Sequence, residues 1–218
     1  MYRAIMQANN MPSRCGMRLV VALVVGLSST GAIARQPVFA ALYAGGTVFD
    51  TDYQYAGTLP SSLDDDGDSV GLGVGYEVTQ HWFLQLDYIH SDAGDVDIDQ
   101  VFLSLNYQMP LFIKGMRGVV GVVAGEGRLD WNSPPGFADA RFDDLDDDES
   151  LYGIKLELNY DLSEHWSTSL SYQYFSQEFN TNIDVATGID IGGAEVTTRA
   201  EFEHKEHQYV LFGIRYHL

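Results

Sequence analysis

The last eleven residues of the chain, 208–218 (QYVLFGIRYHL), alternate between two kinds of side chain. Every second position carries a large apolar residue: Val210, Phe212, Ile214, Tyr216 and Leu218. The positions between them carry a smaller or more polar set: Tyr209, Leu211, Gly213, Arg215 and His217. A period of two over this length predicts a β-strand whose two faces meet different surroundings.

Seven further runs show the same period, so the sequence predicts eight strands. The seven runs cover residues 41–50, 69–78, 82–90, 100–107, 117–131, 152–162 and 166–175. Long polar connections are expected at 51–68, 132–148 and 177–207. Two short connections, Tyr76–Trp82 (YEVTQHW) and Tyr160–Trp166 (YDLSEHW), match each other position by position in chemical type. A repeated hairpin of this kind is typical of an up-and-down antiparallel meander.

Tyrosine and tryptophan mark the ends of the predicted strands on their apolar faces. Because of the order of the connections, these ends share one rim. The predicted aromatic girdle is Tyr76, Trp82, Tyr107, Tyr160, Trp166 and Tyr216. Such rings suit a membrane interface, with the apolar body in lipid and the polar tip among headgroups. Strands in lipid must close into a barrel, since an open edge leaves backbone groups without hydrogen bonds. A soluble secreted β-protein is the alternative, because its strands alternate as well.

The first 34 residues have the features of an export signal. Arg14 and Arg18 precede the apolar run Leu19–Leu27, and a small-x-small pattern ends at Ala34. The run is too short for a spanning helix, which needs about 20 apolar residues. We therefore expect a signal peptide at 1–34 and a barrel domain at 35–218, with cleavage after Ala40 as the alternative.

Charge and cysteine content exclude several functions. Cleavage after Ala34 leaves 9 basic and 31 acidic residues, a net charge of −22. Such acidity argues against a nucleic-acid partner, because that binding depends on Lys and Arg neutralising phosphates. The only cysteine, Cys15, lies in the segment expected to be removed. Disulfides, thiol catalysis and cysteine-bound metal are therefore not expected in the mature chain, nor is any cofactor.

The terminal strand resembles the C-terminal signal of bacterial outer-membrane β-barrels, which has an aromatic residue two positions before a hydrophobic last residue. The residues that carry this insertion signal are Phe212, Gly213, Tyr216 and Leu218, although the family usually ends in Phe. The eight runs, the two matching turns and residues 169–174 (SLSYQY) add to the likeness. Over residues 38–218 the chain is similar to the small outer-membrane barrels of the OmpA/OmpX type.

This resemblance implies an all-β fold, an eight-stranded antiparallel up-and-down transmembrane barrel, without the periplasmic peptidoglycan-binding domain of longer relatives. It implies a monomer surrounded by outer-membrane lipid and lipopolysaccharide, inserted with the help of periplasmic chaperones and the barrel-assembly machinery. The expected function is non-enzymatic and structural or adhesive: the barrel stabilises the outer membrane and presents acidic extracellular loops. A lipid A-modifying enzyme and a narrow ion-conducting porin are the alternatives, because a fold of this kind does not decide the function.

Five charged residues are predicted on the inward faces of the strands: Glu126, Arg128, Lys155, Glu157 and Arg215. The interior of an eight-stranded barrel is filled by side chains. An unpaired charge there would be very costly. We therefore expect these residues to form a salt-bridged plug rather than a gated conduit.

Two acidic clusters lie in the long connections. They comprise Asp64, Asp65, Asp66 and Asp68, and Asp143, Asp144, Asp146, Asp147 and Asp148. Hard cations prefer several carboxylate oxygens, so the clusters are weak candidates for Ca²⁺ or Mg²⁺ and for bridging through such ions to lipopolysaccharide. Neither matches an EF-hand loop, since position twelve counted from Asp64 is Gly75. Solvated loops without bound metal are the plainer reading.

His90 and Ser91 invite comparison with a lipid A deacylase family whose pattern is His-x-Ser-Asn. In this chain the two residues are adjacent and Asp92 follows. Adjacent residues of a strand face opposite sides, so His90 cannot readily act as the base for Ser91. No catalytic residue is predicted.

Overall fold

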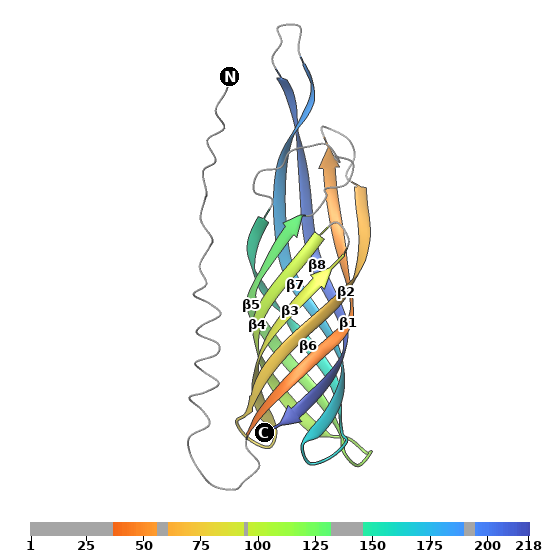
Figure 1. The fold of residues 1–218 in the computed structure, drawn as a ribbon, viewed down its shortest axis with the longest axis vertical. Helices are drawn as coiled ribbons and strands as arrows, with labels where there is room; N and C mark the ends of the chain where they lie inside the picture. Colours follow the sequence, from red (N-terminus) through yellow and green to blue (C-terminus); the bar gives the residue numbers. More distant parts are fainter. Residues whose placement is uncertain (1–36, 56–60, 94–95, 132–145, 190–194) are drawn as a thin grey trace, which may run out of the picture. The chain divides into compact units, whose positions relative to one another are not determined.

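The computed structural model describes residues 37–55, 61–93, 96–131, 146–189 and 195–218. They form eight antiparallel strands (Figure 1). The strands are β1 (Val38–Tyr55), β2 (Ser61–Glu77), β3 (Trp82–Asp92), β4 (Val96–Pro110), β5 (Met116–Trp131), β6 (Asp146–Asp161), β7 (Trp166–Ile189) and β8 (Glu195–His217). Within these ranges, no helix has the length and apolar character needed to cross a membrane. The expected signal peptide, 1–34, lies outside the described residues.

The eight strands close into a barrel in which each strand pairs with its neighbours along the chain. Closure is made by β1 and β8, whose pairing runs without a break from Phe39 opposite His217 to Phe49 opposite His207. The terminal strand thus satisfies the backbone groups of the first one, as the sequence predicts. The expected all-β, eight-stranded up-and-down barrel is confirmed.

The period of two in the sequence becomes an inside and an outside. On β3 the inward residues Phe83, Gln85 and Asp87 are buried, while Trp82 and Leu84 between them are exposed. On β8 the stripe that includes Val210 and Phe212 faces outward. The faces are inverted relative to a soluble sheet, because the large apolar side chains are exposed and many polar ones are buried.

The strands extend further beyond the membrane-spanning part than the sequence pattern predicts. The expected connections 51–68 and 177–207 are largely strand, since β1 continues to Tyr55, β7 to Ile189 and β8 begins at Glu195. Figure 1 shows β7 and β8 continuing past the other strands. Polar residues above a membrane can pair through their backbones without any apolar alternation. Periodicity therefore could not reveal these extensions.

The glycines of β2 make room for large groups inside the barrel. Gly73 lies against the carboxylate of Asp87, and Gly75 lies against the ring of Phe39. A β-carbon at either position would overlap the group it faces. At these two positions the inward face of β2 therefore has room only for residues without a side chain.

Gly75→Ala should destabilise the barrel by about 1–3 kcal/mol, because the added methyl group displaces the buried Phe39 ring in a packed interior. Gly46→Ala is the matched control, since a β-carbon at that outward position meets only ordinary contacts, the nearest at 3.6 Å. Urea unfolding in detergent micelles, followed by tryptophan fluorescence, measures both variants. Equal midpoints for the two would contradict the packing described here.

Candidate functional site

The outer wall carries an apolar belt bounded at one rim by the predicted aromatic girdle. Tyr76, Trp82, Tyr107, Tyr160, Trp166 and Tyr216 all lie on the outward faces of their strands. Their rings pair between neighbouring strands, with centroids 5.0 Å apart for Trp82 and Tyr107 and 4.9 Å apart for Trp166 and Tyr216. Paired rings at one level are suited to the boundary between acyl chains and headgroups.

A second set of aromatic residues, which sequence reasoning missed, bounds the opposite edge of the belt. Tyr88, Tyr152 and Tyr172 are exposed on the outward faces of β3, β6 and β7. The hydroxyl of Tyr88 donates to Asp99 Oδ1 at 2.6 Å, and that of Tyr172 donates to Gln208 Oε1 at 3.1 Å. These tips reach from the belt towards polar groups above it, as amphipathic side chains do at an interface.

Inside the barrel, four charged residues form one ion-paired group, which we call the lumen charge cluster: Asp87, Lys155, Glu157 and Arg215. The guanidinium Nη2 of Arg215 donates to both carboxylate oxygens of Glu157, at 2.6 and 2.8 Å. Lys155 Nζ lies 3.3 Å from Glu157 Oε2 and 3.9 Å from Asp87 Oδ2. The residues come from β3, β6 and β8, and their side chains are at most 4% exposed. Two acids and two bases thus balance in a buried layer of the interior.

Polar and aromatic neighbours complete the lumen charge cluster. Gln85 accepts from Arg215 Nη2 at 3.2 Å and donates to Asp87 Oδ1 at 2.6 Å. The Arg215 guanidinium also lies over Phe39 and Phe83, 4.9 and 5.4 Å from the ring centroids. These hydrogen bonds offset part of the desolvation cost of the buried charges. Asp87 Oδ2, Lys155 Nζ and Arg215 Nε interact through charge alone and make no hydrogen bond within the described protein.

Apolar layers lie on both sides of the lumen charge cluster. Towards the girdle rim, Phe39, Phe83 and Val119 pack together. Towards the other rim lies a larger group that includes Phe102, Phe175 and Tyr209, with ring centroids 5.1–5.3 Å apart. A third layer contains Phe49, Val96, Ile98, Leu129 and Phe179. The described interior is therefore a packed core with a charged layer in it.

Glu126 and Arg128 do not face the lumen, so that part of the sequence prediction is wrong. On β5 the inward positions are Val119, Val123 and Leu129, which are buried, whereas Glu126 is exposed and Arg128 half-buried on the outer wall. The beginning of this strand is apolar on both faces, so the sequence did not show which face was inward. Charges are tolerated here because this part of the outer wall lies at and above the edge of the apolar belt, from the level of Val101 and Tyr88.

Above the belt, aspartates stand directly opposite one another across four strands. We call this set the acidic row: Asp68 pairs with Asp92, Asp92 with Asp97, and Asp97 with Asp130. All four occupy outward positions. Like charges facing each other across a sheet are destabilising. Positive charge near the acidic row would therefore stabilise this part of the wall.

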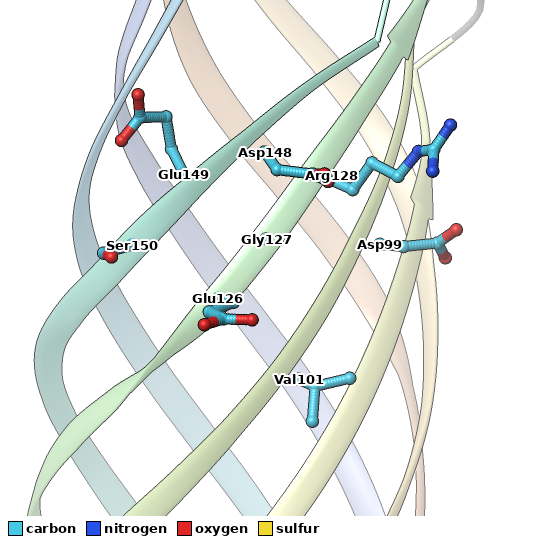
Figure 2. Close-up of a pocket in the computed structure, with 8 residues that line it drawn as sticks. All are labelled: Asp99, Val101, Glu126, Gly127, Arg128, Asp148, Glu149 and Ser150. Atoms are coloured by element: carbon cyan, nitrogen blue, oxygen red, sulfur yellow. The ribbon is translucent and has the colours of Figure 1, made fainter. Parts of the chain in front are cut away.

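The next row towards the belt contains both signs of charge. Asp99 pairs with Arg128, which pairs with Asp148, and Figure 2 shows Asp99 and Arg128 extending outward from β4 and β5. Arg128 Nε also lies 3.3 Å from Asp130 Oδ1. A pocket of ≈ 390 Å³ on the outer wall is lined by Asp99, Arg128 and Asp148 together with Val101, Glu126, Gly127, Glu149 and Ser150. Acidic groups outnumber the single arginine among its lining residues.

The predicted acidic clusters are only partly described. Asp66 and Asp68 are exposed on β2, and Asp148 is exposed on β6. Asp64, Asp65, Asp146 and Asp147 lie in strands for which side chains are not described, and Asp143 and Asp144 lie outside the described residues. Among the side chains that are described, no three His, Cys, Asp or Glu groups converge closely enough to hold a metal ion.

His90 and Ser91 face opposite sides of the wall, as the sequence predicts. Ser91 points inward, where its hydroxyl lies 2.9 Å from that of Ser69. His90 points outward, with Nδ1 2.9 Å from Asp99 Oδ1. The two side chains therefore cannot form a nucleophile and base pair.

The four residues of the predicted insertion signal lie at the end of β8. Phe212, Tyr216 and Leu218 face outward with the apolar belt, while Gly213 faces inward beside Tyr43 and Ser169. The Leu218 amide donates to the Val38 carbonyl at 3.1 Å, so even the last residue joins the closing pair of strands.

Glu157→Gln should destabilise the barrel by about 3–5 kcal/mol, since it leaves Arg215 and Lys155 with a neutral partner in a dry interior. Glu126→Gln is the control, because its carboxylate is on the exposed wall and a change there is worth about 0.5 kcal/mol or less. Urea unfolding in micelles distinguishes the two. A large effect at Glu126 and none at Glu157 would reverse the assignment of inside and outside.

Comparison with known proteins shows a shared fold but finds no relative by sequence. No protein-family model and no curated sequence matches the chain. One match is the solved structure of the outer-membrane protein OprG from Pseudomonas aeruginosa, with 14% identity and a TM-score of 0.54. The match spans 84% of this chain and 98% of the OprG chain. Neisserial surface protein A covers 82% and 99%, with 12% identity and a TM-score of 0.49. The OprF N-terminal β-barrel domain of P. aeruginosa covers 84% and 98%, with 15% identity and a TM-score of 0.45. With its closed ring of eight strands, the chain has the fold of the small outer-membrane β-barrels.

Proposed function

We propose that the protein is a non-enzymatic, structural barrel of the bacterial outer membrane that strengthens the outer leaflet. In this proposal the acidic row and the acidic residues near it hold divalent cations, which bridge to the phosphates of lipopolysaccharide. The observation that carries the proposal is the acidic row itself, which lies immediately above the apolar belt.

The two rims support an orientation with the girdle rim on the periplasmic side. At the girdle rim the described connections are short, 78–81, 111–115 and 162–165, and at the other rim β7 and β8 extend well beyond the belt. Barrels of this class keep short turns on the periplasmic side and long segments outside the cell. The acidic row then lies at the level of the outer-leaflet headgroups.

Electrostatics supports a cation at this level. Neighbouring strands are about 4.8 Å apart, and two carboxylates at that distance repel each other by about 1 kcal/mol in water. Among the described residues of the acidic row and the row beside it, only Arg128 carries a fixed positive charge. Hard divalent cations take six to eight oxygen ligands. Lipid phosphates would supply the oxygens that this wall lacks.

The filled lumen favours a structural role over a channel. An ion crossing the barrel would have to pass the apolar layer of Phe102, Phe175 and Tyr209 and separate the Arg215–Glu157 pair. Removing either charge from its partner in a dry interior is strongly unfavourable. Single-channel recordings in planar bilayers should therefore show no steady conductance.

The outer wall also favours a binding role over lipid modification. A hydrolase needs a nucleophile within hydrogen-bond reach of its base. His90 is occupied by Asp99, and its neighbour Ser91 is bonded inside the barrel to Ser69. No described hydrogen bond joins His90 to a serine. Hydrolysis of lipid A by the purified protein is therefore not expected.

The test is the thermal stability of the barrel in vesicles that contain lipopolysaccharide. Removing divalent cations with EDTA should lower the stability by about 1 kcal/mol, the amount a ligand contributes at several times its dissociation constant. Adding Mg²⁺ or Ca²⁺ should restore it. The loss of the heat-modifiable folded band on a gel reports the unfolding midpoint.

The double variant Asp68→Asn, Asp92→Asn should lose at least half of this cation dependence, because it removes one opposed pair of the acidic row. The control Glu77→Gln, Glu164→Gln removes the same charge at the opposite rim and should keep the full response. Vesicles without lipopolysaccharide should show little cation effect. An unchanged midpoint in EDTA, or equal responses from the two double variants, would refute the proposal.

A further inference from the structure

The turn between β4 and β5, Leu111–Gly115, differs from the other two turns at the girdle rim. In those turns a hydroxyl caps the chain: Thr79 Oγ1 accepts from the amide of Trp82 at 3.1 Å, and Ser163 Oγ accepts from the amide of Trp166 at 3.1 Å. Their tips, TQH and SEH, are polar. The β4–β5 turn has the sequence LFIKG and places its apolar residues at the tip.

The backbone of this turn is well defined and lies beside the girdle. The Leu111 amide donates to the Met116 carbonyl at 3.0 Å, and the Met116 amide donates to the Ile113 carbonyl at 3.0 Å. Gly115 adopts a φ of 84°, which favours glycine. Its α-carbon faces the Tyr160 ring, since a β-carbon built there would lie 3.7 Å from Cε2. The turn therefore lies at the depth of the aromatic girdle.

The apolar side chains of the turn have no cover within the described protein. Phe112 is fully exposed, and Ile113 is 58% exposed. Figure 1 shows this yellow-green turn projecting sideways from the lower rim. Leu111 behaves differently, because a β-carbon built on Gly118 would lie 3.5–3.8 Å from its side chain, which therefore covers this part of the barrel wall. The turn is thus continuous with the lipid-facing surface.

The outward side chains of the wall next to the turn are apolar, apart from the hydroxyl of Tyr172. A shallow groove of ≈ 430 Å³ begins at Met109 and Gly118 and crosses the wall past Leu156 and Leu158 to Tyr172 on β7. Lys114, beside the exposed pair, is itself exposed and can reach a lipid phosphate. An apolar tip followed by a flexible cation is the arrangement that an interfacial membrane contact requires.

We propose that the β4–β5 turn is a membrane foot: Phe112 and Ile113 insert among the acyl chains of phospholipids in the inner leaflet of the outer membrane, and Lys114 lies among their phosphates. The occupant is phospholipid rather than a periplasmic protein, because the turn continues the apolar belt at the level of Tyr160. The foot is on one side of the barrel only, so it would set the depth and tilt of the barrel in the bilayer.

The test uses single cysteines, since Cys15 is the only cysteine of the chain and lies in the segment expected to be removed. Nitroxide labels are attached to Phe112→Cys and Ile113→Cys in the mature chain, folded into vesicles of phosphatidylethanolamine and phosphatidylglycerol. Control labels are placed at Gln80→Cys and Glu164→Cys, on the two polar turns. Collision of each label with oxygen, which concentrates in lipid, and with a water-soluble nickel chelate is measured by electron paramagnetic resonance.

The labels at 112 and 113 should favour oxygen over the nickel chelate several-fold more than the labels at 80 and 164 do. Equal preference for the water-soluble chelate at all four positions would overturn the proposal. Since all four sites are on turns at the barrel surface, the gel shift of the folded barrel should be kept in every variant.

A second measurement places the label beside the turn, so that it replaces neither Phe112 nor Ile113. The label itself then cannot cause insertion of the turn. A label at Met109→Cys, an exposed outward position beside the turn, is compared with and without the replacements Phe112→Ser and Ile113→Ser. Contact of this label with the nickel chelate should rise at least twofold when the two apolar side chains are removed. An unchanged value would show that Phe112 and Ile113 do not hold the turn in lipid.

Discussion

Closure of the backbone hydrogen-bond ladder is the constraint on which the rest of this structure depends. In lipid no water can hydrogen-bond to the backbone N–H and C=O groups of an open strand edge, so β1 must pair with β8 across the whole belt. The uninterrupted pairing from Phe39–His217 to Phe49–His207 meets that requirement, and the last amide, Leu218, still donates to Val38. In the closed barrel each side chain faces either the lumen or the outside, because successive residues of a strand point to opposite faces.

The two surfaces then follow different rules. The outside is apolar between two sets of aromatic residues and becomes acidic above them. The described interior is filled by side chains, and its charges are matched, Arg215 and Lys155 with Glu157 and Asp87, and covered by aromatic layers. Glycines on β2 provide the room that these large groups need. Among the described residues, the chemistry available for binding is therefore on the outer wall, above and below the belt.

The fold could be predicted from the sequence because lipid imposes a strict alternation on the spanning residues, from Trp82 to Tyr88 or from Tyr216 back to Val210. Beyond the belt that requirement disappears, which explains why the extensions of β7 and β8 were missed. Glu126 and Arg128 were placed inside for a related reason: their strand begins with valines on both faces, so charge alone suggested a lumen position. The acidic row could not be foreseen, because it depends on the register of four strands rather than on any local cluster.

The most direct test of this account is amide hydrogen exchange of the barrel in detergent micelles, followed residue by residue by NMR. A closed ring predicts that the amides of β1 and β8 across the belt, 39–48 and 208–217, exchange as slowly as those of β4 and β5 on the far side of the ring. Exchange of β1 and β8 within seconds, with β4 and β5 still protected, would show an open sheet and would contradict the closed barrel.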